Sequence, residues 1–343
     1  MTVEPEITSR VELCSPDGRT LNPLALGWSR TPLHRANLRG GFGRTKRWDY
    51  WAVLAHDFVF SVVYADVDYL GIVASWWADL ATGETGGREL SVPLARGLAL
   101  PEDPGTAPLR WSGRGIDLAV SDAPDRTRIL AAWTESDGRA SRCDVAVDRP
   151  PGHESVNVVI PWSARRFQYT SKHQARPARG VVEIGGRRIE IGGDGREAWG
   201  VLDVGRGRWP YRTRWNWGGG AGRSACGRHV VGIQVGGKWT EGTGFTENGV
   251  IVDGRVTKLG DELAWDYSWE QPMRPWRVRD PGGRLDLELE PRFDRHSKVE
   301  AVVLGTEVHQ VFGRWSGRVV DDAGREIALD GMQGFAEESR SRW

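Results

Sequence analysis

The 343-residue chain has few cysteines and no excess of charge of either sign. Cys14, Cys143 and Cys226 are widely spaced and form no CxxC pair, which argues against a disulfide framework and a cysteine zinc cluster. Lys plus Arg and Asp plus Glu both number 46, whereas a dedicated nucleic-acid binder is basic. We therefore expect no nucleic-acid partner.

Long hydrophobic runs are also missing. A membrane-spanning helix needs about 18 or more consecutive apolar residues, and the sequence contains no such stretch. The first ten residues hold Glu4, Pro5 and Glu6 in place of the apolar centre of a secretory signal. With the sparse cysteines, these features predict a cytoplasmic protein without an integral membrane segment, and they leave the oligomeric state open.

No segment of the N-terminal half keeps a helical period over three turns, whereas glycine and tryptophan are abundant, at 45 and 18 residues. Short runs rich in β-branched and aromatic residues, such as 48–54, 58–64 and 70–77, predict successive strands. The pairs Gly185-Gly186 and Asp253-Gly254 predict tight hairpins. The fold class that follows is all-β.

One aromatic motif occurs twice. The string Arg47-Trp48-Asp49-Tyr50 aligns with Arg214-Trp215-Asn216-Trp217 at an offset of 214 − 47 = 167 residues, about half the chain. Because side chains of a strand alternate, Trp215 and Trp217 share one face and Arg214 and Asn216 share the other. The repeat predicts two antiparallel β-barrels or sheets related by a pseudo-repeat. We expect domains at 1–165 and 166–343, divided in the polar segment 163–178.

The chain resembles the domain-of-unknown-function 2804 family. The motifs that carry the resemblance are Lys46 to Trp51, Asp68 to Gly71, Phe167 to His173, Trp209 to Trp217, and Gly237 to Gly244 through Asn248. The resemblance implies no particular reaction. At greater distance the two-barrel architecture is similar to the tandem lipocalin-like fold of carotenoid hydratases and tocopherol cyclases, which implies two lipocalin-like units but no catalytic residue.

Acid–base chemistry is the reaction class best supported by the residues in these motifs. Asp49, Glu241 and Glu247 lie next to aromatic residues or glycines and are the candidate catalytic residues. A carboxylic acid in an apolar pocket has a raised pKa and can protonate an alkene or an ether oxygen near neutral pH. The structural alternative is an internal bridge between Arg47 and Asp49 that plugs the barrel.

Aromatic and basic residues of the two motif regions are the candidate ligand-binding residues: Arg47, Trp48, Tyr50, Arg214, Trp215, Asn216, Trp217, Lys238 and Trp239. The tryptophans either fill a barrel core or line a cavity for an apolar ligand. Lys238 is either a solvated residue at the barrel rim or a partner for an anionic head group. We expect the glycine-rich stretch Gly218 to Ser224 to form a mobile loop at a barrel mouth.

Other catalytic machinery is not indicated. The seven histidines form no HxH or HExxH pattern, and no GxSxG or phosphate-binding loop is present, so we expect no metal and no cofactor. The leading hypothesis is a cofactor-independent hydratase, cyclase or isomerase acting on an apolar, isoprenoid- or polyketide-like molecule. The alternative is a non-catalytic carrier of a lipid or small molecule. A third, a glycosidase, would need two carboxyls across an open cleft.

Overall fold

The computed structural model describes residues 4–193, 195–300 and 304–343. In these ranges the regular secondary structure is almost entirely strand, and the one helical element is the 3-10 turn η1 (Pro23–Ala25). No helix of the described ranges is long and apolar enough to cross a membrane. Short strands β1 (Val11–Glu12) and β3 (His34–Arg35) pair with each other in the N-terminal segment.

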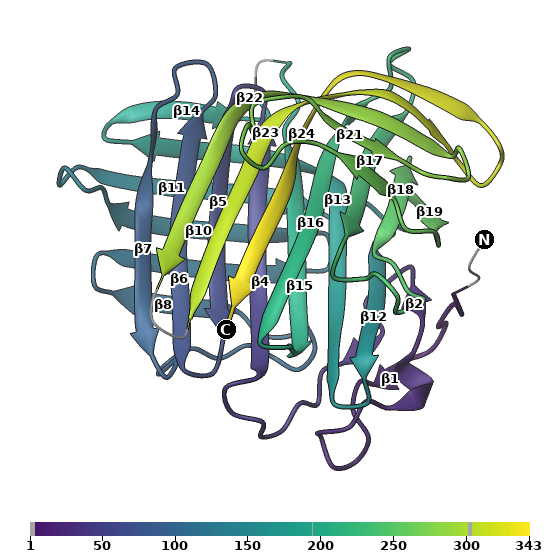
Figure 1. Cartoon of the computed structure of the whole chain (residues 1–343). Coiled ribbons are helices and arrows are strands. Elements are labelled where there is room, and N and C mark those ends of the chain that lie inside the picture. Colours follow the sequence, from purple (N-terminus) through teal and green to yellow (C-terminus); the bar gives the residue numbers. More distant parts are fainter. Residues whose placement is uncertain (1–3, 194, 301–303) are drawn as a thin grey trace.

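The first large sheet has the order β7-β6-β5-β4-β15-β13-β11-β10-β9-β8, with β2, β12 and β14 attached at its side. Its strands are β2 (Trp28–Ser29), β4 (Thr45–Ala55), β5 (Phe58–Asp66), β6 (Leu70–Asp79), β7 (Thr85–Pro93), β8 (Leu109–Gly113), β9 (Ile116–Ala123), β10 (Arg126–Thr134), β11 (Ala140–Asp148), β12 (Val156–Ser163), β13 (Arg166–Ile184), β14 (Arg187–Ile191) and β15 (Trp199–Arg208). The sheet curls on itself, so that β8 to β11 cross behind β4 to β7 (Figure 1).

The second sheet has the order β19-β18-β17-β16-β24-β23-β22-β21-β20. Its strands are β16 (Arg212–Arg223), β17 (Val230–Gly237), β18 (Asn248–Val252), β19 (Arg255–Leu259), β20 (Ala264–Asp266), β21 (Trp276–Arg279), β22 (Leu285–Glu300), β23 (Gly305–Val320) and β24 (Glu326–Arg342). In Figure 1 its long strands β22, β23 and β24 run diagonally in front of the first sheet.

The two sheets share one connectivity. In each, an early strand (β4 or β16) pairs on one side with the strand that follows it and on the other with the last strand of the sheet, β15 or β24. The repeated motif therefore lies on equivalent strands. The structure confirms an all-β protein of two curled antiparallel half-barrel sheets, as expected for two tandem lipocalin-like units.

The chain passes from one sheet to the other between Arg208 and Arg212. The segment expected to divide two domains, 163–178, lies mostly within β13, a strand in the middle of the first sheet. The polar composition of this segment suggested a linker. Composition alone does not show that a polar strand is buried within the folded protein. The division at residue 165 stays a prediction about independently folding units.

The prediction of a mobile glycine loop at 218–224 is wrong, because residues 218–223 lie within β16. A Cβ atom at Gly219 would lie 2.7 Å from the ring of Phe335, and one at Gly220 would lie 2.5 Å from the carbonyl oxygen of Gln333. Both distances are too short for a methyl group. The glycines therefore allow β16 to pack closely, and they do not serve mobility.

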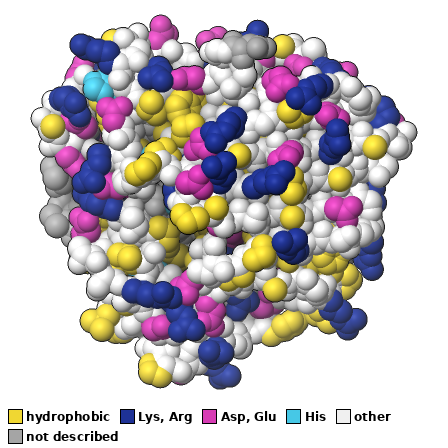
Figure 2. Space-filling model, turned by 180° about the vertical axis from the view of Figure 1, so that it is seen from behind, with side chains coloured by type: hydrophobic (Ala, Val, Ile, Leu, Met, Phe, Trp, Pro, Cys, Tyr) yellow, Lys and Arg dark blue, Asp and Glu magenta, His cyan; other side chains and the backbone are white. Residues whose placement is uncertain are grey.

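Hydrophobic side chains fill the inside of each curled sheet and the space between the two sheets, because each sheet buries residues on both of its faces. On β4, Trp51 and Val53 point into the core of the first sheet, whereas Ala52 and Leu54 pack with Phe312 in a layer between the sheets. The outer surface, seen from behind in Figure 2, intersperses basic, acidic and hydrophobic side chains. This mixture agrees with the zero formal net charge.

Candidate functional site

A cavity of about 320 Å³ lies between the two sheets. The first sheet contributes residues of β4, β5, β6, β13 and β15, and the second contributes residues of β16, β22, β23 and β24, which cross in front of the first sheet in Figure 1. The aromatic residues of the lining are Trp48, Tyr50, Trp209, Trp215, Trp217, Trp239 and Trp343, and the charged ones are Lys172, Asp203, Glu247, Arg295 and Glu337. The volume is at the lower end of the range for small-molecule sites.

The repeated motif places an aromatic ring opposite a carboxyl group in each sheet. Tyr50 on β4 is the register partner of Asp203 on β15, and Trp217 on β16 is the register partner of Glu337 on β24. The rings of Tyr50 and Trp217 meet edge to face, with centroids 5.7 Å apart. The pseudo-repeat thus brings two equivalent aromatic–acid pairs to the same cavity.

In each copy of the motif, the first tryptophan donates a hydrogen bond to the acid of its own sheet. Trp48 Nε1 lies 3.1 Å from Asp203 Oδ2, and Trp215 Nε1 lies 2.7 Å from Glu337 Oε1. Gly205, the register partner of Trp48, keeps this arrangement possible, because a Cβ there would lie 2.1 Å from the indole ring. The geometry of both acids is therefore set by the motif tryptophans.

Lys172 on β13 forms the charged centre of the first-sheet side. Its Nζ lies 2.9 Å from Asp203 Oδ1 and 3.3 Å from Glu247 Oε2, and it sits 4.3 Å from the ring centroid of Trp217. Burial alone would disfavour the ammonium, but the neighbouring charges of Asp203 and Glu247 raise the pKa of Lys172. The lysine is held charged, and it holds its carboxylate partners in the cavity wall.

Glu337 has a different environment. Its register partner on β23 is the neutral Gln310. The register partner of Asp203 on β13 is instead the positively charged Lys172. Burial raises the pKa of Glu337 to about 7, against the lowering effects of the Trp215 hydrogen bond and the more distant Lys172 charge. Burial likewise raises the pKa of Glu247, whose Oε1 accepts a hydrogen bond of 2.8 Å from Trp239 Nε1. The two repeat-related acids thus differ in their surroundings. Asp203 is in ion-pair contact with Lys172, whereas Glu337 has no ion-pair contact among the described residues, and the charges of Lys172 and Arg295 act on it from a greater distance.

Six residues predicted from the sequence lie together in this cavity: Trp48, Tyr50, Trp215, Trp217, Trp239 and Glu247. Arg47 and Asp49 point to the opposite face of β4, as strand alternation requires. There Asp49 accepts a hydrogen bond of 2.7 Å from Arg206, and Arg47 contacts Asp66 at 3.5 Å. The internal Arg47–Asp49 bridge is therefore wrong, because each residue has its own partner on a neighbouring strand.

The remaining predicted residues do not line the cavity, and three of them, Arg214, Lys238 and Glu241, border one surface cleft. Arg214 and Lys238 contact Glu338 at 2.7 and 3.0 Å, and Asn216 Nδ2 donates to the Tyr267 hydroxyl at 3.0 Å. Glu241 is exposed to solvent at this cleft. Their roles, like that of Asp49, stay predictions, and the proposal below does not use them.

The three charged residues that the proposal below uses together with Glu247 were not found from the sequence: Lys172, Asp203 and Glu337. Lys172 lies in a motif of the family resemblance, and Glu337 lies in the C-terminal run of two glutamates. Nothing local marks any of the three as a cavity residue. Only the pairing of strands far apart in the chain shows that each faces a motif aromatic.

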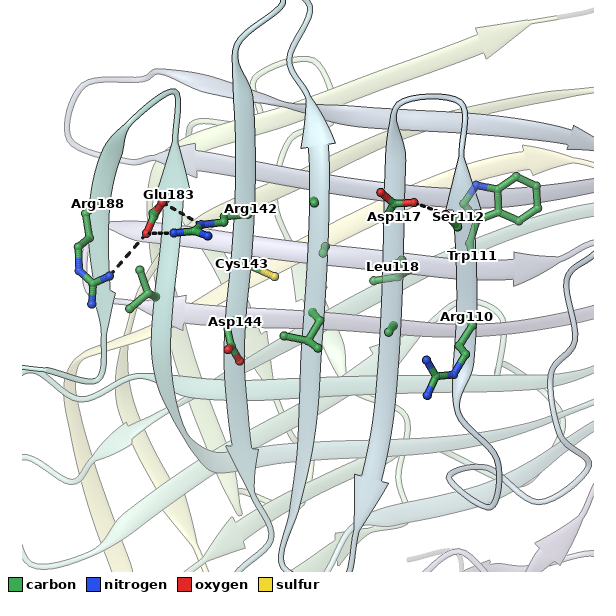
Figure 3. A pocket seen from close by; sticks show the side chains of 15 residues that line it. Arg110, Trp111, Ser112, Asp117, Leu118, Arg142, Cys143, Asp144, Glu183 and Arg188 are labelled. Carbon is green, nitrogen blue, oxygen red and sulfur yellow. Dashed lines mark hydrogen bonds and ion pairs between the residues drawn. The ribbon is translucent and has the colours of Figure 1, made fainter.

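A second hollow, of about 730 Å³, lies on the outer face of β8 to β11, β13 and β14 (Figure 3). Several of its polar side chains pair with one another: Arg142 Nε donates to Glu183 at 2.9 Å, and the Ser112 hydroxyl donates to Asp117 at 2.5 Å. Most of these side chains are exposed to solvent. The hollow offers no desolvated acid, so the cavity between the sheets is the candidate site.

Solved structures with the same arrangement of sheets include kievitone hydratase from Nectria haematococca. It matches with a TM-score of 0.51 and 10% identity over 100% of this chain and 98% of that chain. Structures of CghA with Sch210972 and of CghA match with TM-scores of 0.42 and 0.40, each at 12% identity, over 88% and 90% of this chain and 89% and 90% of theirs. At these identities the likeness concerns the fold.

No curated protein matches in sequence. The model of the domain of unknown function 2804 matches residues 4–343, so the chain belongs to the DUF2804 family.

Proposed function

We propose that the protein is an enzyme that transfers a proton to an apolar small molecule in the cavity between the sheets, with Glu337 as the proton donor. The observation that carries the proposal is the contrast between the two repeat-related acids. Asp203 contacts the Lys172 ammonium, whereas the pKa of Glu337 is raised to about 7. In acid–base enzymes, two carboxyl groups with different surroundings take different roles in this way.

The reaction class follows from the lining. Proton transfer from Glu337 to an alkene carbon or an ether oxygen forms a carbocation or an oxonium ion, which the faces of Trp217 and its neighbours stabilise. Addition of water then releases a proton and completes a hydration, attack by another group of the same molecule completes a cyclisation, and loss of a proton completes an isomerisation. Glu247 or Asp203 accepts the released proton. The fold shared with a protein named as a hydratase supports this class.

The second candidate is a carrier of a lipid or other apolar molecule, and the aromatic lining favours it. A carrier needs the apolar walls but has no use for several buried acids in one cavity, where burial of each ionised group is costly. The presence of Glu337, Glu247 and Asp203 in the lining therefore favours the enzyme.

Isotope incorporation distinguishes the two candidates and does not require an identified substrate. Apolar metabolites extracted from cells would be incubated with the protein in D₂O enriched in H₂¹⁸O and analysed by mass spectrometry. We expect at least one metabolite to gain deuterium, with or without ¹⁸O, in the presence of the wild type and not of Glu337→Gln. A metabolite that binds both proteins in native mass spectrometry and gains no isotope would support the carrier and contradict the enzyme.

Replacing Trp215 with Phe tests how the proton donor is tuned. The Trp215 hydrogen bond favours the ionised form of Glu337, so its loss is expected to raise the pKa of Glu337 further above about 7. A hydrogen bond to a charged group contributes about 1.5–3 kcal/mol, which corresponds to roughly 1–2 pH units. The measurement is ¹³C NMR titration of labelled glutamate carboxyls, with Glu337→Gln identifying the signal.

Trp162→Phe is the matched control for this titration, because Trp162 packs on Trp209 and Trp239 and donates to a backbone carbonyl, not to a carboxyl. This variant should leave the pKa of Glu337 unchanged. An equal shift in both variants would show that the aromatic cluster as a whole, and not the Trp215 hydrogen bond, sets the pKa.

A further inference from the structure

Two histidines meet on the second sheet although the sequence has no paired-histidine motif. His296 on β22 and His309 on β23 are register partners, and their rings stack with centroids 4.2 Å apart and planes 4° apart. Glu307 lies beside them, and one ligand atom of each of the three residues lies within 4.8 Å of the other two. Two imidazoles and a carboxylate thus lie together on two neighbouring strands. Because the nitrogen lone pairs of parallel rings do not meet at one point, one imidazole has to turn out of the stack to share an ion with the other.

The contacts within this group resemble those of a site prepared for a metal ion. His309 Nδ1 lies 2.8 Å from Asp294 Oδ2, which leaves Nε2 of the ring available, and metal-ligating histidines commonly have such a carboxylate behind them. His296 Nε2 lies 3.1 Å from Glu307 Oε1. Two ligands of one tetrahedral zinc ion, each bonded at about 2.0–2.2 Å, are separated by roughly 3.4 Å.

Two carboxylates contact the histidines of this group, and the neighbouring arginine, Arg340 on β24, is the register partner of Glu307 and lies over the ring of Trp269. Asp294 Oδ1 is buried and has no hydrogen-bond partner among the described residues, and Glu307 supplies a second carboxylate. The cation in contact with Glu307 is Lys298, whose Nζ lies 3.1 Å from Oε2 on a side chain that is 51% exposed. An exposed lysine is a weak competitor for the carboxylate, because solvent screens the pair.

We propose that His296, Glu307 and His309 bind one divalent first-row transition metal such as Zn²⁺, with Asp294 positioning His309. The imidazole ligands select this class over Mg²⁺ and Ca²⁺, which prefer oxygen donors. The cavity-lining residues Arg295 and Gln310 alternate with the two histidines along the same strands. The metal therefore lies on the other face of the cavity wall and cross-links β22 to β23, apart from the proposed proton transfer.

Calorimetric titration of the full-length, EDTA-treated protein with Zn²⁺ tests the site, and Co²⁺ absorption reports its coordination. We expect one equivalent to bind, with visible Co²⁺ bands typical of a tetrahedral site. His296→Ala or His309→Ala should lose this binding, and Asp294→Asn should weaken it by about 10–100-fold. Lys298→Met should tighten it, because Glu307 loses its competing cation, and a misfolded variant cannot produce such a gain.

His229→Ala is the matched control. His229 pairs with Asp253 at 2.7 Å, as His309 does with Asp294, but no second histidine ring stacks on it among the described residues. This variant should keep the full stoichiometry and affinity. Failure of the wild type to bind Zn²⁺, or binding that His296→Ala leaves unchanged, would overturn the proposal.

Discussion

Glu337→Gln is expected to lower turnover by about 10²–10⁴-fold while the cavity still binds its ligand, because a general acid contributes a factor of this size. Glutamine keeps the shape of the side chain and can still accept the hydrogen bond from Trp215. It cannot transfer a proton at neutral pH. The measurement is the rate of isotope incorporation into the substrate, combined with native mass spectrometry of the bound ligand.

The pH profile adds a second, independent readout. Since the pKa of Glu337 is raised to about 7, the proton donor is present below that pH and is lost above it. The wild-type rate should therefore fall on the alkaline side of about pH 7. The residual rate of Glu337→Gln should lack this limb.

Stability should change in the same pH window. In the folded protein Glu337 stays protonated up to about pH 7, whereas in the unfolded chain it ionises near its ordinary pKa of 4.5. The stabilisation that this pKa difference gives to the folded state is fully present below about pH 4.5 and is lost as pH rises through about 7. The loss in the free energy of unfolding is at most roughly 3 kcal/mol. Urea unfolding should thus show Glu337→Gln gaining stability relative to wild type between these pH values.

Glu338→Gln is the control on the neighbouring residue. Burial would raise the pKa of Glu338, but hydrogen bonds from Arg340, Tyr267, Arg214 and Lys238 lower it to about 2, and the side chain faces away from the cavity. Its stabilisation is present above the ordinary pKa and is lost as pH falls toward about 2. This variant should keep the alkaline limb of the rate. If it lost the limb and Glu337→Gln kept it, the assignment of the proton donor would be wrong.

Lys172→Met is expected to lower the free energy of unfolding by about 3–5 kcal/mol near neutral pH, because removing one member of a buried ion pair leaves the others uncompensated. Asp203 and Glu247 would both lose their contacts of 2.9 and 3.3 Å with the ammonium. Methionine retains most of the side-chain volume, so the loss reports charge more than packing. Urea unfolding followed by tryptophan fluorescence measures it.

Two comparisons separate this charge effect from a general defect. Lys298→Met removes a lysine from an exposed pair with Glu307 and should cost no more than about 1 kcal/mol. The Lys172→Met deficit should shrink toward about pH 4.5, because burial raises the pKa of Glu247 and this acid, once protonated, no longer needs the ammonium. A deficit that is equal at both pH values would assign the role of Lys172 to packing.

The local pattern of the sequence was sufficient for the fold class and for part of the site. Strand alternation is a property of neighbouring residues, so it correctly separated Trp215 and Trp217 from Arg214 and Asn216. The repeat likewise predicted two related sheets, because each copy begins an equivalent strand. Glu247 and five aromatic residues of the cavity followed from the motifs alone.

Alternation does not tell which face of a strand meets a second sheet. Asp49 and Trp48 are adjacent in the chain, yet Trp48 lines the cavity and Asp49 is buried against Arg206 on the other side. The glycines 218–220 were misjudged for a related reason: their need for space comes from Phe335 and Gln333, which are remote in sequence.

The sequence by itself determined that the protein is built of strands, that one aromatic motif occurs in each half, and which motif side chains point together. Only the tertiary structure decided which acids lie in the cavity and which groups surround each of them. Strand pairing placed Asp203 opposite Tyr50 and Glu337 opposite Trp217, and the next strands placed Lys172 beside one acid and Gln310 beside the other. A pKa depends on burial and on charges within a few ångströms, which are properties of the assembled sheets and not of the chain order.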